Sequence, residues 1–387
     1  MNKSWWHSKN ELDKDQKKFI RLPPHGRYSL VGPPGSGKTN LLLLRALFIA
    51  GTGERNVLII TFTKALADFI RTGINSEGSI SPDQVRTYHS WAAAHILEHL
   101  GHFALPKDTE FNEESRKEIL NFLRKANERI PAKKLFSAIF VDEAQDLTAD
   151  ELEVLLTLSD NVCICGDDRQ GIYNRDGLSA AERLALDVHV LKRHFRIGHK
   201  IARVADRLMP PDEDLESLEA TSNYNAKEQG ESSAHMHACA NRNEQFEKLV
   251  KSIRIQLDAF KDDSIGIFCP TRDALSDLRM RLDGTDLKDK VCVHSIDAES
   301  SFGGGKLIHA LTIHAAKGTE FRAVHIFGAE EMAVFPMNRR RLGYTAVTRA
   351  KTSLNAYRTG DTNRPLENAF AEPKHMDLDD LFPRDKS

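Results

Sequence analysis

Short apolar runs alternate with helical segments along most of the chain. In the first half, the apolar runs lie at residues 28–31, 56–60, 136–141 and 162–165. Helical segments at residues 40–47 and 65–72 follow the first two of these runs. Strands that alternate with helices are typical of parallel sheets covered by helices on both faces. The pattern therefore predicts an α/β fold.

A second series of apolar runs lies beyond residue 187, at residues 265–269, 291–293, 311–313 and 324–327. This repetition predicts two similar α/β halves joined near residue 190. An acidic and then polar stretch, residues 210–233, is expected to be a solvated surface loop. The expected parts are an N-terminal lobe at 1–190 with a short helical insertion at about 95–135, a C-terminal lobe at 191–372, and an acidic tail at 373–387.

The composition of the chain is that of an ordinary globular protein and gives no sign of a strongly basic, nucleic-acid-binding chain. The 387 residues are 28% charged and 40% hydrophobic, which is an ordinary balance for a soluble globular protein. The formal net charge is −2, so the chain has no overall basic character that would favour nucleic acid. Any binding of nucleic acid must therefore depend on a local surface.

Five cysteines lie within or beside apolar runs, and no C-x-x-C pair is present. We expect buried thiols rather than disulfides or a metal site. No apolar run reaches the ~18 residues of a membrane span, and the N-terminus has no apolar signal core. The sequence therefore predicts a cytoplasmic protein without a membrane partner.

The sequence GPPGSGKT fits the phosphate-binding pattern G-x-x-x-x-G-K-[ST], between an expected strand and an expected helix. Glycines let backbone N–H groups turn toward phosphate oxygens, and the helix start adds its positive dipole end. A glycine-rich turn without a ligand is the alternative, which the strand, the spacing, Lys38 and Thr39 argue against. The predicted ATP-binding residues are Gly32, Pro33, Pro34, Gly35, Ser36, Gly37, Lys38 and Thr39.

The sequence VDEAQD, residues 141–146, follows an apolar run about a hundred residues after the phosphate loop. At the end of a buried strand, Asp142 would complete a Mg²⁺ site with the hydroxyl of Thr39. Glu143 would polarise the attacking water. An acidic helix start is the alternative interpretation, but the position after a phosphate loop favours the metal site.

Seven further segments occur along the chain in an order typical of one family. They are LDKDQ (12–16), TFTKALADFIR (61–71), TYHSW (87–91), ICGDDRQGIY (164–173), LKRHFR (191–196), TIHAAKGTEF (312–321) and YTAVTRAK (344–351). With these segments the chain resembles the superfamily 1 helicases of the UvrD/Rep/PcrA type. This resemblance implies two RecA-like P-loop NTPase lobes with ATP and Mg²⁺ bound between them.

The resemblance implies further contacts with the nucleotide. Gln16 would read adenine, and its amide can both donate and accept hydrogen bonds. Phe195 would stack on the adenine face, with a core aromatic as an equal alternative. Glu320 would contact the ribose, and Gly318 would lie against the nucleotide.

The same resemblance implies the catalytic set Lys38, Glu143, Gln170, Arg196 and Arg349. Gln170 would sense the γ-phosphate. The two arginines would be arginine fingers, because a planar and permanently charged guanidinium stabilises charge on the transferring phosphoryl group. A surface ion pair is the alternative for each arginine.

The resemblance also implies a track for single-stranded DNA, with RNA not excluded. Bases of a single strand stack on aromatic faces while phosphates meet basic groups or N–H donors. Trp91 is expected to be a core residue instead. The candidate DNA contacts are Thr61, Phe62, Tyr88, His89, Tyr173 and His314.

The chain departs from full-length family members by lacking two large inserted subdomains. Only about fifty residues separate Trp91 from Val141, and they contain mostly one amphipathic helix at residues 113–129. The second insertion point, between Arg281 and His309, is too short for a domain. No Trp follows Tyr173, and Asn338-Arg339 replaces a usual acidic pair.

These departures leave several functions open. The first is a 3′→5′ single-stranded DNA translocase or helicase. The second is a DNA-stimulated ATPase that serves as the motor or sensor of a nuclease-containing complex and does not unwind alone. The acidic tail would dock on such a partner or remain solvated. The third is a small-molecule phosphotransferase, which the paired arginines argue against.

Overall fold

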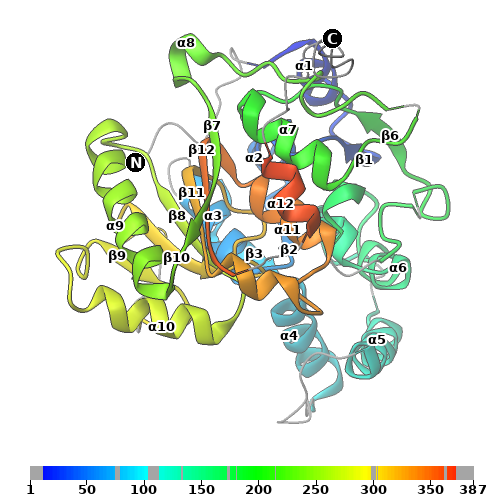
Figure 1. Ribbon diagram of the computed structural model, residues 1–387. Coiled ribbons are helices and arrows are strands. Elements are labelled where there is room, and N and C mark those ends of the chain that lie inside the picture. The colour runs from blue at the N-terminus through cyan, green and yellow to red at the C-terminus, as the bar shows by residue number, and fades with distance from the viewer. Residues whose placement is uncertain are drawn as a thin grey trace, which may run out of the picture.

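The computed structural model describes residues 12–74, 79–102, 113–131, 134–171, 175–179, 181–213, 215–297, 302, 304–360 and 364–371. Within these residues the strands form two six-stranded sheets. In each sheet, all neighbouring strands pair in parallel. Figure 1 shows helices on both sides of the strands. The predicted α/β fold with two lobes is confirmed.

The first sheet has the strand order β3-β2-β4-β5-β1-β6. Its strands are β1 (Arg27–Val31), β2 (Val57–Thr61), β3 (Val85–Thr87), β4 (Ala138–Val141), β5 (Val162–Gly166) and β6 (Asp187–Val190). The α-helices of this part are α1 (Lys14–Ile20), α2 (Lys38–Gly51), α3 (Lys64–Ile74), α4 (Tyr88–Leu100), α5 (Glu113–Glu128) and α6 (Ala149–Leu156).

The two faces of the first sheet pack against different helices. On β4, Ala138 and Phe140 join the apolar cluster of α1, α2 and α3, whereas Ile139 and Val141 join that of α4, α5 and α6. Successive side chains of a strand point to opposite faces, so both faces of a central strand are apolar here. This explains the continuous apolar runs in the sequence.

The second sheet has the strand order β7-β12-β11-β8-β10-β9. Its strands are β7 (Ser233–Cys239), β8 (Ile265–Cys269), β9 (Val291–Val293), β10 (Ile308–Thr312), β11 (Phe321–Phe327) and β12 (Ala350–Thr359). The α-helices are α7 (His199–Leu208), α8 (Ala226–Gln229), α9 (Arg242–Ala259), α10 (Arg272–Leu282), α11 (Arg340–Val347) and α12 (Arg364–Phe370). Helices α9 and α10 cover one face, and α7, α11 and α12 cover the other.

The lobe boundary near residue 190 stays a prediction. The first sheet ends with β6 at Val190, and α7 already packs on β7 and β12 of the second sheet. The predicted acidic tail lies outside the described residues.

Three local predictions need correction. The predicted loop at 210–233 contains α8, and its last residue begins β7. Strand β12 was not predicted because Lys351, Thr352, Ser353 and Asn355 interrupt its apolar pattern, although all four are buried. Within the described residues, the predicted insertion at about 95–135 contains the end of α4 as well as α5. Helix α4 begins directly after Thr87, whose hydroxyl accepts a hydrogen bond from the N–H of Ser90. Figure 1 shows α4 and α5 side by side at the lower end of the molecule.

All five cysteines are buried and none forms a disulfide, as predicted. In the part of the chain that the structure describes, no helix combines the length and apolarity needed to cross a bilayer.

Candidate functional site

The phosphate loop lies between β1 and α2. Gly35 and Gly37 adopt positive φ angles of 79° and 86°, which residues with a Cβ rarely adopt. Gly37 is the N-cap of α2, so the first N–H groups of the helix face the loop. Nζ of Lys38 donates to the carbonyl oxygens of Gly32 and Pro33 at 2.7 and 2.9 Å. The two glycines, Lys38 and the start of α2 therefore lie together in one loop, and their contact with a nucleotide stays a prediction.

A cavity of about 290 Å³ lies where the two lobes meet. The first lobe contributes the predicted residues Gln16, Pro34, Gly35, Gly37, Lys38, Thr39, Asp142, Glu143 and Gln170. The second contributes the predicted residues Phe195, Arg196, Gly318, Glu320 and Arg349. Gly32, Pro33 and Ser36 shape the loop without lining the cavity. Segments far apart in the sequence thus surround one space.

Thr39 and Asp142 lie together as a magnesium site requires. Oγ1 of Thr39 donates to the Asp142 carboxylate at 2.7 Å, although the two residues come from different elements. Burial raises the pKa of Asp142, and the neighbouring Glu143 raises it further. A buried carboxylate whose charge is not compensated favours a cation. The hydroxyl and carboxylate oxygens are donors that suit Mg²⁺, so the residues fit this ion.

Glu143 follows Asp142 in a strained conformation with a φ of 55°. Burial alone would raise its pKa, but Lys317, Arg349 and Lys38 outweigh burial and lower it. The side chain is therefore ionised at neutral pH and accepts a hydrogen bond from the amide of Gln145. An ionised carboxylate beside the phosphate loop can orient a water molecule.

Arg196 crosses over the phosphate loop. A Cβ added to Gly35 would lie 3.0 Å from Cβ of Arg196, and the N–H of Phe195 donates to the carbonyl of Gly35 at 3.2 Å. The guanidinium pairs with Glu320, which also accepts from Nζ of Lys351 at 3.0 Å. Burial opposes ionisation of Glu320, but these two cations lower its pKa to about 2.

Arg349 is buried at the same cavity. Its guanidinium donates to the side-chain oxygen of Gln170, and to the carbonyls of Thr345 and Thr319 at 3.2 and 3.3 Å. Burial lowers its pKa from the usual value, and the nearby Arg196 adds to this. Two cations held close together in a buried cavity favour an anionic ligand.

Gln16 and Phe195 border the other end of the cavity. The amide of Gln16 accepts from the N–H of Asp13 at 3.0 Å and donates to the carbonyl of Ser36 at 2.9 Å. Phe195 is half-buried and lines the cavity. Contact of either side chain with a base stays a prediction.

Sequence reasoning missed two groups of residues here. Asn40, Phe69, Gln229, Asp263, Arg322 and Lys351 also line the cavity. In addition, Nζ of the buried Lys317 donates to the carboxylate of Asp146 at 2.6 Å and to the carbonyl of Gln170 at 2.9 Å. Lys317, Lys351 and Asp146 lie inside the segments TIHAAKGTEF, YTAVTRAK and VDEAQD, so their place in these motifs could have identified them. No local pattern pointed to Gln229, Asp263 or Arg322.

A second cluster surrounds Phe62, which follows β2. The guanidinium groups of Arg116 and Arg175 lie 5.8 and 5.6 Å from the centre of its ring, and the ring of His89 lies 5.5 Å away. Burial lowers the pKa of His89 to about 4, and the two arginines contribute. An aromatic ring bordered by cations is a suitable contact for a nucleotide base and its phosphate.

The other predicted DNA contacts lie in different settings. Tyr88 is 1% exposed and Thr61 is also 1% exposed, so neither side chain is available to a base in this conformation. His314 is half-buried beside Arg339, and burial lowers its pKa. Trp91 is a core residue, as predicted. Tyr173 lies outside the described residues.

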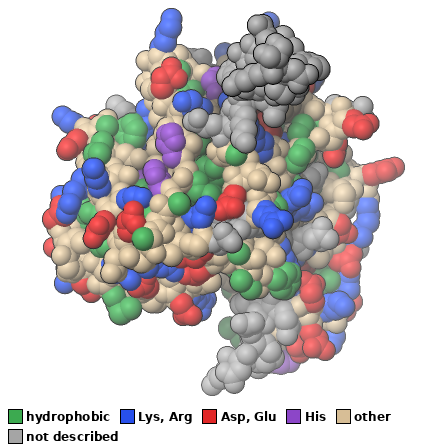
Figure 2. All heavy atoms as spheres, viewed as in Figure 1, with side chains coloured by type: hydrophobic (Ala, Val, Ile, Leu, Met, Phe, Trp, Pro, Cys, Tyr) green, Lys and Arg blue, Asp and Glu red, His purple; other side chains and the backbone are tan. Residues whose placement is uncertain are grey.

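On the face shown in Figure 2, basic and acidic side chains are interspersed. This agrees with the net charge of −2. Any nucleic-acid surface on this face must therefore be local.

Two family models match the chain. One, described as an AAA domain, matches residues 16–176 and includes the phosphate loop and Asp142. The other, described as a UvrD-like helicase C-terminal domain, matches residues 307–357 and includes Gly318, Glu320 and Arg349. The two matches therefore contain most of the residues on both sides of the cavity.

Individual relatives match shorter parts. Over 82 residues, 18% of this chain, the sequence is 39% identical to the ATP-dependent DNA helicase PcrA of Bacillus subtilis (strain 168), and covers 11% of that protein. Among solved structures, the C-terminal domain of a possible DNA helicase from Lactobacillus plantarun WCFS1 matches with a TM-score of 0.34 and 17% identity. That match covers 44% of this chain and 91% of the other.

Proposed function

The chain belongs to the UvrD-like helicases of superfamily 1, and from this premise we propose that it hydrolyses ATP between its two lobes to move along single-stranded DNA. The observation that carries the proposal is the composition of the cavity between the lobes. Arg196 and Arg349 line the same space as Lys38, Thr39 and Glu143, although they come from opposite ends of the chain.

The first lobe contributes four side chains with distinct roles in phosphoryl transfer. Lys38 leaves the carbonyls of the loop to bind the β- and γ-phosphates, and the N–H groups at the start of α2 bind phosphate oxygens. Thr39 and Asp142 would hold Mg²⁺, which would neutralise charge on the phosphates. Glu143 orients the water that attacks the γ-phosphorus.

The second lobe stabilises the charge that develops on the phosphoryl oxygens. Arg349 turns its guanidinium group from Gln170 toward the γ-phosphate, and Arg196 turns its own from Glu320. Gln170 then senses whether the γ-phosphate is bound. Glu320 contacts the ribose, and Gln16 and Phe195 hold the adenine. Closure of the lobes on ATP and reopening after hydrolysis move the strand stepwise.

The strand would cross Phe62 and His89 on the first lobe and His314 on the second. Arg116 and Arg175 lie beside Phe62, and the charge of Arg116 is compensated by its buried ion pair with Glu151. We propose movement in the 3′→5′ direction.

The ATPase activity is tested by steady-state rates with single-stranded DNA, single-stranded RNA and duplex DNA. We expect strong stimulation by single-stranded DNA and no activity in Lys38→Ala. The matched control is Lys248→Ala, whose exposed side chain pairs with Glu244 on the surface of α9. A rate that is the same with and without nucleic acid would instead support a phosphotransferase.

The direction is tested by displacement of streptavidin from biotinylated oligonucleotides. We expect ATP-dependent release from the 5′ end only. Preferential release from the 3′ end would overturn the proposed direction while leaving the ATPase intact.

A second candidate is an ATPase that needs a nuclease or another protein partner to separate strands. It is favoured by the short connections at both insertion points, since only β9 and its flanking turns lie between α10 and β10 in the described residues. Unwinding of a tailed duplex by the purified chain at low salt would exclude this candidate.

A further inference from the structure

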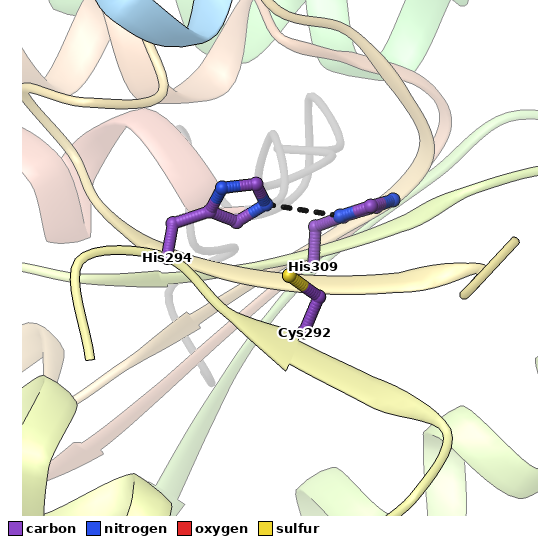
Figure 3. Close-up of side chains that lie close together, drawn as sticks. All are labelled: Cys292, His294 and His309. Carbon is purple, nitrogen blue, oxygen red and sulfur yellow. Dashed lines mark hydrogen bonds between the residues drawn. The ribbon is translucent and has the colours of Figure 1, made fainter. Parts of the chain in front are cut away.

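Three side chains that bind metals in other proteins meet at one edge of the second sheet. Cys292 on β9 is the register partner of His309 on β10. His294 directly follows the last residue of β9, and its backbone N–H donates to the carbonyl of Ala310 on β10 at 2.9 Å. Strand pairing therefore brings the three together, and Figure 3 shows the two imidazole rings meeting above the sulfur of Cys292.

The distances suit a metal ion. One ligand atom from each residue can be chosen so that all three lie within 4.8 Å of one another. Nε2 of His294 lies 3.0 Å from Nδ1 of His309. Two nitrogens bound to a tetrahedral Zn²⁺ at about 2.05 Å would lie about 3.3 Å apart, so the rings need to separate by only a few tenths of an ångström.

The three side chains are buried, and His294 keeps the largest exposed fraction. Cys292, His294 and His309 are 2%, 8% and 2% exposed. The ring of Phe302 lies against both imidazoles, with ring centres 4.5 and 4.6 Å apart. The charged groups that act on His294 are Asp68 and Lys64 of α3 in the first lobe and Asp297 in its own segment.

We propose that Cys292, His294 and His309 bind Zn²⁺ through Sγ, Nε2 and Nδ1, with solvent at the fourth position. Two imidazole nitrogens and one thiolate form a donor set that selects zinc over magnesium or calcium. The ion fastens the short edge strand β9 to β10 next to α3. The site is separate from the ATP cavity, since none of its ligands lines that cavity.

A zinc site here would differ from the expectation based on cysteine spacing. The absence of a C-x-x-C pair argued against a metal site, but the third ligand comes from a neighbouring strand. His309 is fifteen residues from His294 along the chain, and only the pairing of β9 with β10 brings them together.

The test measures zinc in the purified full-length chain after exposure to a chelator and then to Zn²⁺ followed by dialysis. We expect about one zinc per chain, released again by chelation. Cys292→Ser and His309→Gln are expected to lose it. The matched control is Cys239→Ser, which changes a buried thiol on the opposite edge strand, β7, and should keep the full content.

Substitution with Co²⁺ reports the ligands directly and does not depend on the variants folding. The wild-type chain is expected to show a thiolate-to-cobalt charge-transfer band and the intense visible absorption of a tetrahedral site, both removed by added Zn²⁺. A wild-type chain that takes up neither metal would overturn the proposal, and the cluster would then be a hydrogen-bonded histidine pair beside a thiol. Because ATP hydrolysis is not the readout, this failure is distinguishable from failure of the proposed ATPase.

Discussion

Buried charged side chains set the chemistry of the cavity at the scale of single residues. Arg349 is 3% exposed and holds its charge by donating to Gln170 and to backbone carbonyls. Removal from water makes its charge more effective toward a phosphoryl group than an exposed arginine would be. An exposed ion pair such as Arg254–Asp286 has no such effect.

Arg349→Ala is therefore expected to lower kcat for ATP hydrolysis by about 10³-fold or more, while the KM for ATP changes only slightly. The measurement is steady-state ATPase activity at saturating single-stranded DNA, with circular dichroism to verify folding. Arg254→Ala is the control and should behave as the wild type. A folded Arg349→Ala protein with more than a tenth of the wild-type kcat would contradict the role of this residue.

His325, which lies outside the ATP cavity, should make the stability of the fold depend on pH. It is completely buried between the hydroxyl of Tyr357 and the amide of Gln256, and burial lowers its pKa to about 3. A group with a lowered pKa in the folded state stabilises the fold above its unfolded pKa, about 6.5, and this contribution is lost as the pH falls below that value.

Between pH 7.5 and pH 5.5 His325 alone should lower the free energy of unfolding by about 1.4 kcal/mol. Urea unfolding of the wild type and of His325→Gln at both pH values measures this. The variant cannot bind the proton, so its loss over the same range should be smaller by about that amount. Equal losses in the two proteins would show that His325 is not the titrating group.

At the scale of elements, the loop after β10 is held against α3 of the first lobe. Gly318 has a φ of 80°, and a Cβ at this position would lie 2.5 Å from a methyl carbon of Leu66. Thr63, at the start of α3, donates to the carbonyl of Lys317 at 3.2 Å. The loop therefore contacts α3 closely through a residue without a side chain.

Gly318→Ala is expected to destabilise the protein by about 1–3 kcal/mol, because the new methyl group meets both an unfavourable φ and Leu66. Thermal unfolding measures the loss. Adding Leu66→Ala should remove the steric part, so the double variant should lose less than the sum of the two single variants. Additive losses would indicate that only the backbone conformation matters.

At the scale of the whole molecule, the two lobes are joined by a buried ion pair. Lys317 of the second lobe donates to Asp146 and to the carbonyl of Gln170 in the first. Burial raises the pKa of Asp146 to about 6 even though Lys317 lowers it. Breaking such a pair leaves a buried charge without a partner, which costs about 3–5 kcal/mol.

Lys317→Met should therefore destabilise the closed arrangement of the lobes strongly, and Lys317→Met with Asp146→Asn should recover part of the loss. Denaturant unfolding measures the stability, and small-angle scattering measures the separation of the lobes. Lys248→Met, which breaks an exposed pair with Glu244, is the control and should have little effect. A Lys317→Met protein as stable and compact as the wild type would contradict this role.

The sequence by itself determined the α/β class, the phosphate loop and the order of the motifs, because alternating apolar runs and local glycine, lysine and carboxylate spacing depend on neighbours along the chain. Only the tertiary structure decided which distant residues meet. Arg322, Gln229 and Asp263 reached the cavity, Tyr88 turned into the core, and His309 came to lie beside Cys292. Strand order and lobe packing bring these residues together, and neither is encoded in any short segment of the chain.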